Sequence, residues 1–184
     1  MHLYAHGSDV ALLESMPKLL RNRIIRHIDR RASGLTFVSQ NLADRYQEIL
    51  GRTSNVPITV CPMGIESDGI DETYEDEWKI RKGQKLLVSS IGRLVPIKGH
   101  DTLIRAASGL PNLILVIAGS GPEKVHLEAL AQCLNVDVVF VGIVDSRMRN
   151  ALLNQTDLFV VASKKLGCRQ EGTPLSAMEA LDMG

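Results

Sequence analysis

The feature that most constrains the fold is a regular alternation of apolar runs and amphipathic segments in the second half of the chain. The apolar runs predict strands over 85–92, 113–118, 138–141 and 157–162. The segments that follow them predict helices over 99–108, 122–133, 145–154 and 174–183. This order indicates βαβ units, in which helices cover both faces of a parallel sheet. Ligands bind such sheets at the carboxyl ends of the strands, so the loops there are the first places to look for a site.

The first third of the chain predicts a second, smaller α/β unit. Its expected strands and helices lie at 3–5, 17–31, 35–38, 39–51 and 57–61. An acidic stretch over 68–77 then interrupts the pattern, so we expect a domain boundary near residue 66 and a linker or exposed helix over 67–84. The sequence therefore predicts an α/β fold with domains at 1–66 and 85–184.

Composition excludes several classes of protein. Lys and Arg together number 21, as do Asp and Glu, so the overall charge does not favour nucleic-acid binding. No apolar run reaches the length of a membrane span, and the first residues lack the basic start of a signal peptide. The three cysteines are odd in number and lack metal-binding spacing, which indicates reduced thiols of a cytosolic protein.

The stretch from Gln170 to Leu181, Q-E-G-T-P-L-S-A-M-E-A-L, predicts an anion site at the start of a helix. Gly172 permits close backbone approach, Thr173 is a good N-cap, and Pro174 suits the first helical position. The free N–H groups and the dipole of that helix attract anions. Two carboxylates flank this point, and they can hold hydroxyl groups on both sides of a bound diphosphate.

These two carboxylates belong to Glu171, just before the helix, and Glu179, about 9 Å along its axis from the cap. For Glu179 there is a simpler alternative, a solvated acid on the outer face of a capped helix.

The loop Ile91–Gly99 carries two cations between a strand and a helix. Gly92 lets a ligand approach the end of the strand. Arg93 can hold a diphosphate through two parallel hydrogen bonds, and Lys98 can act as a point charge. The alternative is a surface loop whose cations are solvated.

Two further strand ends carry glycines. Gly119, in A-G-S-G-P-E over 118–123, permits a tight turn and a close backbone approach, although a plain strand-to-helix turn is the alternative. Gly142 lies in the stretch 141–145, where backbone groups can read the edge of a base.

Taken in order, these stretches resemble the motifs of the family 4 glycosyltransferases, which are retaining enzymes with the two-domain GT-B fold. E-G-T-P-L-S-A-M-E-A-L resembles the paired-glutamate motif, G-R-L-V-P-I-K-G the diphosphate loop, and G-S-G-P the glycine turn. H-G-S-D over 6–9 resembles the loop in which a histidine faces the donor sugar, the alternative being a histidine satisfied within its own loop. Residues 167–170 resemble the bacterial exopolysaccharide branch, such as the colanic-acid-type transferases.

The resemblance implies a GT-B-like architecture and a reaction. The second domain would be a parallel-sheet, donor nucleotide-sugar-binding domain, and residues 1–66 the C-terminal part of an acceptor-side α/β domain. Compared with the family, the chain would be truncated at both ends. The expected reaction transfers a sugar from a nucleoside-diphosphate sugar to a hydroxyl acceptor with retention, in surface polysaccharide or glycolipid synthesis. No cofactor or metal is expected, since the chain has no Asp-x-Asp pair.

The resemblance also assigns roles to residues. The predicted catalytic residues are Arg93, Lys98, Glu171 and His6. The predicted donor-binding residues are Gly92, Gly119, Gly142, Gly172, Thr173, Pro174, Leu175 and Glu179. Among these, Glu171 would orient the sugar hydroxyls and Glu179 would hold the ribose diol.

The helix expected over 17–31 has one basic face, which favours contact with an anionic membrane surface or a lipid-linked acceptor. We therefore expect a cytoplasmic protein, with peripheral contact at the inner face of the membrane; a solvated helix face is the alternative. Two other functions remain open: a nucleotide-sugar-binding module without catalysis, and a sugar-nucleotide epimerase of the same fold. The donor sugar, the base and the acceptor do not follow from the sequence.

Overall fold

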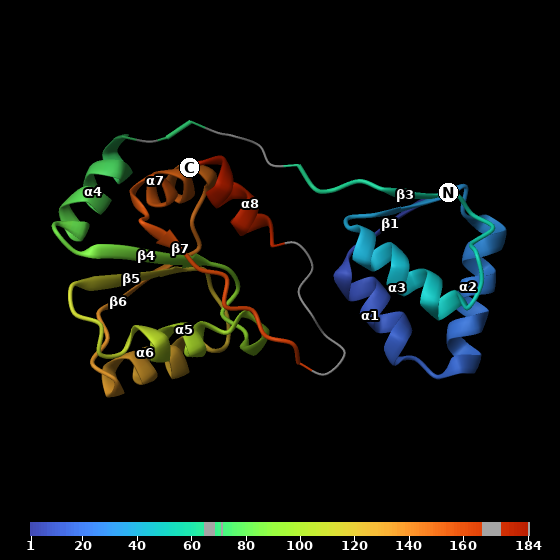
Figure 1. Ribbon diagram of the computed structural model, residues 1–184, viewed down its shortest axis with the longest axis horizontal. Helices are drawn as coiled ribbons and strands as arrows, with labels where there is room; N and C mark the ends of the chain where they lie inside the picture. The colour runs from blue at the N-terminus through green and yellow to red at the C-terminus, as the bar shows by residue number, and fades with distance from the viewer. Residues whose placement is uncertain (65–68, 71, 167–173, 184) are drawn as a thin grey trace. The chain divides into compact units, whose positions relative to one another are not determined.

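The computed structural model describes residues 1–64, 69–70, 72–166 and 174–183 (Figure 1). The chain forms two compact units. Of the described residues, the first unit contains 1–64 and 165–166, and the second contains 69–70, 72–164 and 174–183.

The first unit is built on a three-stranded parallel sheet with the order β1-β2-β3. Its strands are β1 (His2–Ala5), β2 (Gly34–Phe37) and β3 (Ile58–Val60), and its helices are α1 (Gly7–Ser15), α2 (Lys18–Arg31) and α3 (Gln40–Leu50). The core lies where Leu35 and Phe37 of β2 pack against Val10 of α1 and Leu42 and Tyr46 of α3. This central strand is buried along its whole length, as expected of a strand in a covered parallel sheet.

The ends of α3 follow the sequence prediction. The Ser39 hydroxyl accepts a hydrogen bond from the backbone N–H of Leu42 at 3.4 Å, and Gly51 ends the helix with a φ of 63°. The prediction of a loop over residues 6–9 is wrong, because α1 already begins at Gly7. The backbone N–H of His6 donates to the Asp9 carboxylate at 2.8 Å, and this bond satisfies the start of a helix that has no continuous apolar stripe.

The second unit confirms the predicted parallel-sheet α/β fold. Its sheet has the order β6-β5-β4-β7, with every described pair of strands parallel. The strands are β4 (Leu86–Ile91), β5 (Leu113–Ala118), β6 (Val138–Gly142) and β7 (Leu158–Phe159). β7 is shorter than the predicted strand 157–162, because the chain leaves the sheet after two residues and then runs along the loop that follows β4.

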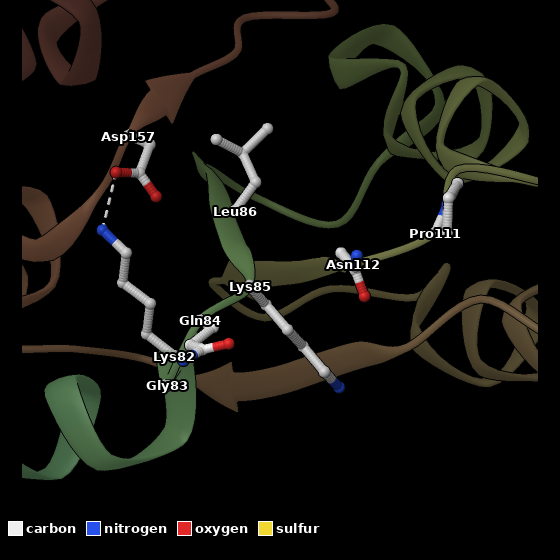
Figure 2. A pocket seen from close by; sticks show the side chains of 8 residues that line it. All are labelled: Lys82, Gly83, Gln84, Lys85, Leu86, Pro111, Asn112 and Asp157. Atoms are coloured by element: carbon white, nitrogen blue, oxygen red, sulfur yellow. Dashed lines mark hydrogen bonds and ion pairs between the residues drawn. The ribbon is translucent and has the colours of Figure 1, made fainter.

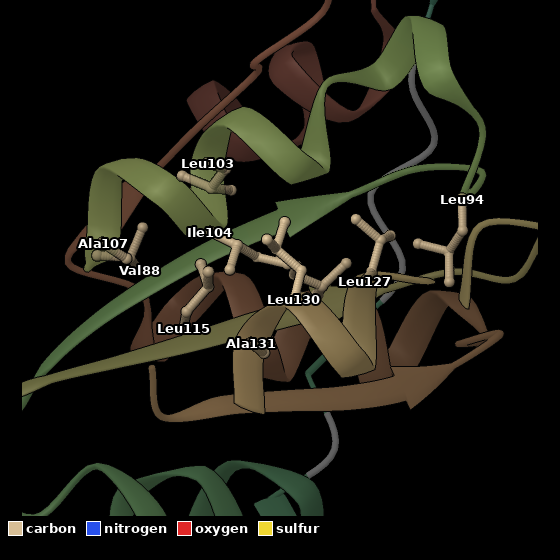
Figure 3. Close-up of a cluster of buried hydrophobic side chains, with 10 residues drawn as sticks. Val88, Leu94, Leu103, Ile104, Ala107, Leu115, Leu127, Leu130 and Ala131 are labelled. Carbon is tan, nitrogen blue, oxygen red and sulfur yellow. The ribbon is translucent and has the colours of Figure 1, made fainter. Parts of the chain in front are cut away.

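Helices cover both faces of this sheet (Figure 1). They are α4 (Glu72–Lys82), α5 (His100–Ala107), α6 (Lys124–Cys133), α7 (Ser146–Gln155) and α8 (Leu175–Asp182). On one face Leu115 and Ile117 of β5 pack with α5 and α6 (Figure 3). On the other face Ile114 and Val116 pack with α4 and α7. Because side chains alternate along a strand, one apolar run supplies both cores.

The expectation of a linker or exposed helix over 67–84 needs a correction. Trp78 of α4 is only 1% exposed, and it packs against Leu87 and Leu152. Because most neighbours of Trp78 in the sequence are charged, the pattern did not indicate that this side chain is buried. α4 is therefore part of the core of the second unit.

Asp157 links three elements at the amino-terminal edge of this sheet (Figure 2). Its carboxylate pairs with the Lys82 ammonium of α4 at 2.6 Å and accepts the backbone N–H of Leu87 at 2.8 Å. These two hydrogen bonds lower the pKa of Asp157 below its ordinary value of 3.8. Beside it lies a shallow hollow of about 520 Å³, at the edge opposite to the one where ligands bind such sheets.

The lowered pKa of Asp157 predicts a pH dependence. The charged carboxylate stabilises the second unit at pH values above 3.8, and this contribution is lost as the pH falls through the lowered pKa. We expect Asp157→Asn to lower the free energy of unfolding by about 1 kcal/mol at neutral pH, since partial exposure screens the ion pair. The difference from the wild type should shrink in acid.

Urea unfolding at several pH values, followed by fluorescence of Trp78, measures this difference, since Trp78 is the chain's only tryptophan. Asp137→Asn is the control, because the Asp137–Lys85 pair is about half exposed on both sides and should contribute little. A constant deficit of Asp157→Asn across the acid range would contradict the prediction.

Candidate functional site

Three loops meet at the carboxyl-terminal edge of the second sheet. We call Gly92–Gly99 the cation loop, Gly119–Glu123 the glycine loop and Gly142–Asp145 the third loop; they follow β4, β5 and β6. The N–H of Gly92 donates to the carbonyl of Ala118 at 2.9 Å, and the N–H of Gly119 donates to that of Gly142 at 2.6 Å. The loops therefore form one connected backbone surface.

Leu94 anchors the cation loop. Its side chain is fully buried in the core beneath the loop (Figure 3). Its N–H donates to the carbonyl of Ser120 at 2.9 Å, and its own carbonyl accepts the N–H of Glu123 at 3.1 Å. A Cβ on Gly121 would overlap the Leu94 backbone, so only glycine allows this approach.

Gly119 and Gly142 have different surroundings. Gly119 has a φ of 137°, and a Cβ there would overlap the carbonyl oxygen of Gly92. Gly142 has a φ of 76°, and a Cβ there would meet no described atom within 4 Å. Gly119 is thus required for packing between loops, whereas the Cβ position of Gly142 is open. The ligand contacts predicted for both stay predictions.

The two predicted cations stand on the cation loop as neighbours of its glycine. Lys98 ends the 3-10 turn Pro96–Lys98, and its Cε would lie 3.3 Å from a Cβ built on Gly92. Arg93 is exposed and makes no ion pair with a residue in the described part of the chain. An ammonium over the end of β4 and an exposed guanidinium beside it suit a polyanionic ligand.

His100 lies under the same loop, and it is not among the residues predicted from the sequence. It is the first residue of α5 and only 3% exposed, and neither ring nitrogen hydrogen-bonds a described residue. Burial lowers its pKa, and the charge of Lys98 lowers it further, while the nearby backbone of Arg93 and Gly92 partly offsets this. The ring is therefore neutral at neutral pH and adds no third cation.

The chain after β7 is fastened to the cation loop. The N–H of Lys164 donates to the carbonyl of Ile97 at 2.7 Å, and its ammonium pairs with Asp101 at 2.7 Å. Burial alone would raise the pKa of Asp101, but the hydrogen bonds and charge of Lys164 outweigh it and lower the pKa. Gly99 completes the contact, because a Cβ there would overlap the carbonyl of Ala162. The residues that make these contacts come shortly before Glu171 in the sequence.

Glu179 lies on α8 and faces α7. Its carboxylate pairs with the Arg149 guanidinium at 2.9 Å, and the side chains are only 12% and 19% exposed. This excludes the alternative of a solvated acid on the outer face. Pro174 is the N-cap of α8 and Leu175 its first residue, one position later than predicted.

The remaining predicted residues lie elsewhere. Glu171, Gly172 and Thr173 are outside the described residues, and their roles stay predictions. His6 is exposed at the start of α1 in the first unit, so its role toward the donor sugar is likewise a prediction. In the described ranges no three His, Cys, Asp or Glu side chains come together as metal ligands, and no helix there is long and apolar enough to cross a membrane.

The parallel sheet, with its loops joined at the carboxyl edge, has the fold of GT-B glycosyltransferases. Residues 71–184 match the family Glycosyl transferases group 1. The chain belongs to this family, whose members are glycosyl-transferring enzymes.

Individual relatives agree with this assignment. A GDP-mannose-dependent alpha-(1-6)-phosphatidylinositol monomannoside mannosyltransferase of Mycolicibacterium smegmatis is 29% identical over 97% of this chain and 49% of its own length. HepE of Anabaena, solved in complex with UDP, superimposes with a TM-score of 0.77 at 18% identity over 98% of this chain and 50% of its own. Sucrose-phosphate synthase of Thermosynechococcus elongatus gives a TM-score of 0.74 at 20% identity, over 99% and 48% of the two chains. The chain spans about half the length of the curated relatives it matches.

The contact between Gly119 and Gly92 makes a testable prediction. Gly119→Ala should destabilise the second unit, because the new methyl group pushes the glycine loop away from the cation loop. Gly83→Ala is the matched control, since Gly83 also has a positive φ of 52° but open space around its Cβ. The control should cost only the backbone strain, about 1–2 kcal/mol, and Gly119→Ala about 2 kcal/mol more. Urea unfolding measures both, and equal losses would contradict the proposed packing role.

Proposed function

We propose that the protein transfers a sugar from a nucleoside-diphosphate sugar to a hydroxyl acceptor with retention at the anomeric carbon. The observation that carries this proposal is the cation loop, which holds Lys98 over Gly92 and leaves Arg93 exposed at the carboxyl edge of β4. A diphosphate is the ligand that best matches two cations above a glycine-lined backbone surface. HepE was solved with UDP and with UDP-glucose, and the mycobacterial relative is named for its dependence on GDP-mannose.

In the proposed reaction the bond between the anomeric carbon and the β-phosphate oxygen breaks. The acceptor oxygen forms a bond to the anomeric carbon on the same face, and the acceptor's proton passes to the leaving diphosphate. Negative charge builds on that diphosphate, and Arg93 and Lys98 would stabilise it together with the start of α8. These cations would do the work that a bound Mg²⁺ does in other transferases, so the proposed reaction needs no metal.

The other predicted residues complete the proposed site. Glu171 would orient the sugar hydroxyls, Glu179 would hold the ribose diol, and His6 would face the donor sugar. The acceptor would be lipid-linked or a saccharide, in surface polysaccharide or glycolipid synthesis. The name of the mycobacterial relative, which specifies a phosphatidylinositol monomannoside acceptor, supports the lipid-linked class.

The epimerase alternative is less well supported. It needs acids for proton transfer and elimination, and the candidates for them in the first unit are Asp9 and Glu14. Asp9 accepts the backbone N–H of His6, and Glu14 is held by Arg45 through hydrogen bonds of 2.9 and 2.5 Å. Both carboxylates are therefore already engaged.

Calorimetric titration with UDP and with GDP, followed by turnover with lipid and polysaccharide acceptors, tests the proposal. Binding together with transfer of the sugar is expected. Binding without transfer would support the nucleotide-sugar-binding module, and conversion of the donor into its epimer would support the epimerase. No binding of either nucleotide would refute the proposal.

Arg93→Ala should weaken the affinity for UDP or GDP about tenfold or more, because a hydrogen bond to a charged group contributes roughly 1.5–3 kcal/mol. Binding of the free nucleoside, which has no phosphate, should change little. Lys85→Ala is the control, since Lys85 precedes the opposite end of the same strand and already pairs with Asp137. If Arg93→Ala leaves the nucleotide affinity unchanged, the alternative is supported, in which this is a surface loop whose cations are solvated.

We also propose that α2 contacts an anionic membrane surface. Leu19 is 86% exposed, and Leu20 is half exposed. The same helix carries five exposed basic side chains. The five are Lys18, Arg23, Arg26, Arg30 and Arg31. Each cation near such a surface contributes about 1 kcal/mol, and the leucines can insert at the interface.

Co-sedimentation with vesicles tests this contact. The chain should pellet with phosphatidylglycerol-containing vesicles and less with phosphatidylcholine alone, and salt should weaken the binding. The double variant Arg23→Glu, Arg30→Glu should lower the partition at least tenfold, whereas Lys124→Glu on the exposed face of α6 should not. Equal pelleting of the double variant and the wild type would rule the contact out.

A further inference from the structure

The ion pair between Arg149 and Glu179 is mostly removed from solvent. It joins the first turns of α7 to the middle of α8, and both side chains are at least four-fifths buried. A carboxylate in this position needs a compensating charge, because an unpaired ion removed from water strongly destabilises the fold. Arg149 supplies that charge within the second unit.

Arg149 is itself held in place. Its Nε and Nη2 atoms donate to Oδ1 of Asn150 at 3.3 and 3.2 Å, while Nη1 contacts Glu179. Asn150 is a buried residue of α7, so it provides a fixed support. The planar guanidinium thus links a rigid point in the core to the carboxylate of Glu179.

This arrangement prepares Glu179 for a ligand. A free glutamate would lose rotamer freedom when it binds, whereas a held one has already lost it. An ionised carboxylate has about four acceptor positions, and the contact with Arg149 uses Oε1. Capacity remains for the two O–H donors of a vicinal diol.

We propose that Arg149 is a positioning residue, which presents the Glu179 carboxylate to the ribose diol of the donor nucleotide. The inference rests on the proposed function, because it takes Glu179 as the ribose-binding acid. A purely structural link between α7 and α8 is the competing explanation. The two differ in one respect: only a positioning residue affects the recognition of the ribose 2′-hydroxyl.

The experiment compares each nucleotide with its 2′-deoxy form. Calorimetry gives the dissociation constants of UDP and 2′-deoxy-UDP, and of GDP and 2′-deoxy-GDP, for the wild type and for Arg149→Gln, Arg149→Lys, Glu179→Gln and Arg147→Gln. The wild type should prefer the ribose form about tenfold. In Arg149→Gln and Glu179→Gln this preference should fall to about twofold or less. Arg147, exposed two residues earlier on the same helix, is the matched control, and Arg147→Gln should keep the full preference.

Arg149→Lys keeps the charge but lacks the fork that reaches both Asn150 and Glu179, so its preference should lie between those of the wild type and Arg149→Gln. A wild-type preference retained in Arg149→Gln would overturn the positioning role, even if the variant were less stable to heat. If Arg149→Gln does not fold, the decision rests on Arg149→Lys, and a full preference in that variant would overturn the role.

The same data separate this inference from the proposed function. A wild type that binds neither nucleotide refutes the proposed function, and the positioning role with it. If the wild type binds both forms of a nucleotide equally well, Glu179 does not recognise the ribose 2′-hydroxyl, and the positioning role is overturned. The proposal of donor binding would remain valid in that case.

Discussion

The site depends first on the burial of Leu94. This side chain sits in the core between the sheet and α6, while its backbone bonds both to Ser120 and to Glu123. The residue before it, Arg93, is exposed, and the turn that ends in Lys98 follows it. Apolar burial thus helps to fix the part of the loop from which the two cations extend.

Glycine makes the rest of this edge possible. At Gly119 and Gly121 a side chain would overlap the backbone of the cation loop, and at Gly99 it would overlap the chain that follows β7. Three loops and a connecting segment can therefore approach within hydrogen-bonding distance of one another. The N–H groups of Gly92, Leu94 and Gly119 are used in these contacts between the loops, so Arg93 and Lys98 supply the positive charge of the cation loop.

Most of the second unit could be predicted from sequence, because its signals are local. The run Leu113–Ala118 is a strand with the predicted ends, and Asp145 caps α7 by accepting the N–H of Met148 at 2.8 Å. Periodicity failed for α1, which starts through a backbone contact with Asp9 and lacks an apolar stripe. It also failed for Trp78, where one buried side chain decides the position of a helix that is otherwise charged.

The arrangement of the candidate site residues was predictable only where those residues share a loop. Arg93 and Lys98 are five positions apart, and their common strand end brings them to one place. Arg149 and Glu179 are thirty positions apart, and neither helix carries a local sign of the other. A long-range pair of this kind follows from how two helices pack on one face of a sheet, which no window of the sequence contains.

The charges of the second unit divide into two groups with different physical roles. Charges at buried positions are paired, as Arg149 is with Glu179, because an unpaired ion there would destabilise the fold. Arg93 stands exposed with no ionic partner among the described residues, and water can solvate it until an anion replaces that water. A held acid and an exposed cation therefore suit different parts of one ligand. In the proposed reaction the first would orient a neutral group, such as a diol, and the second would stabilise a group whose charge changes.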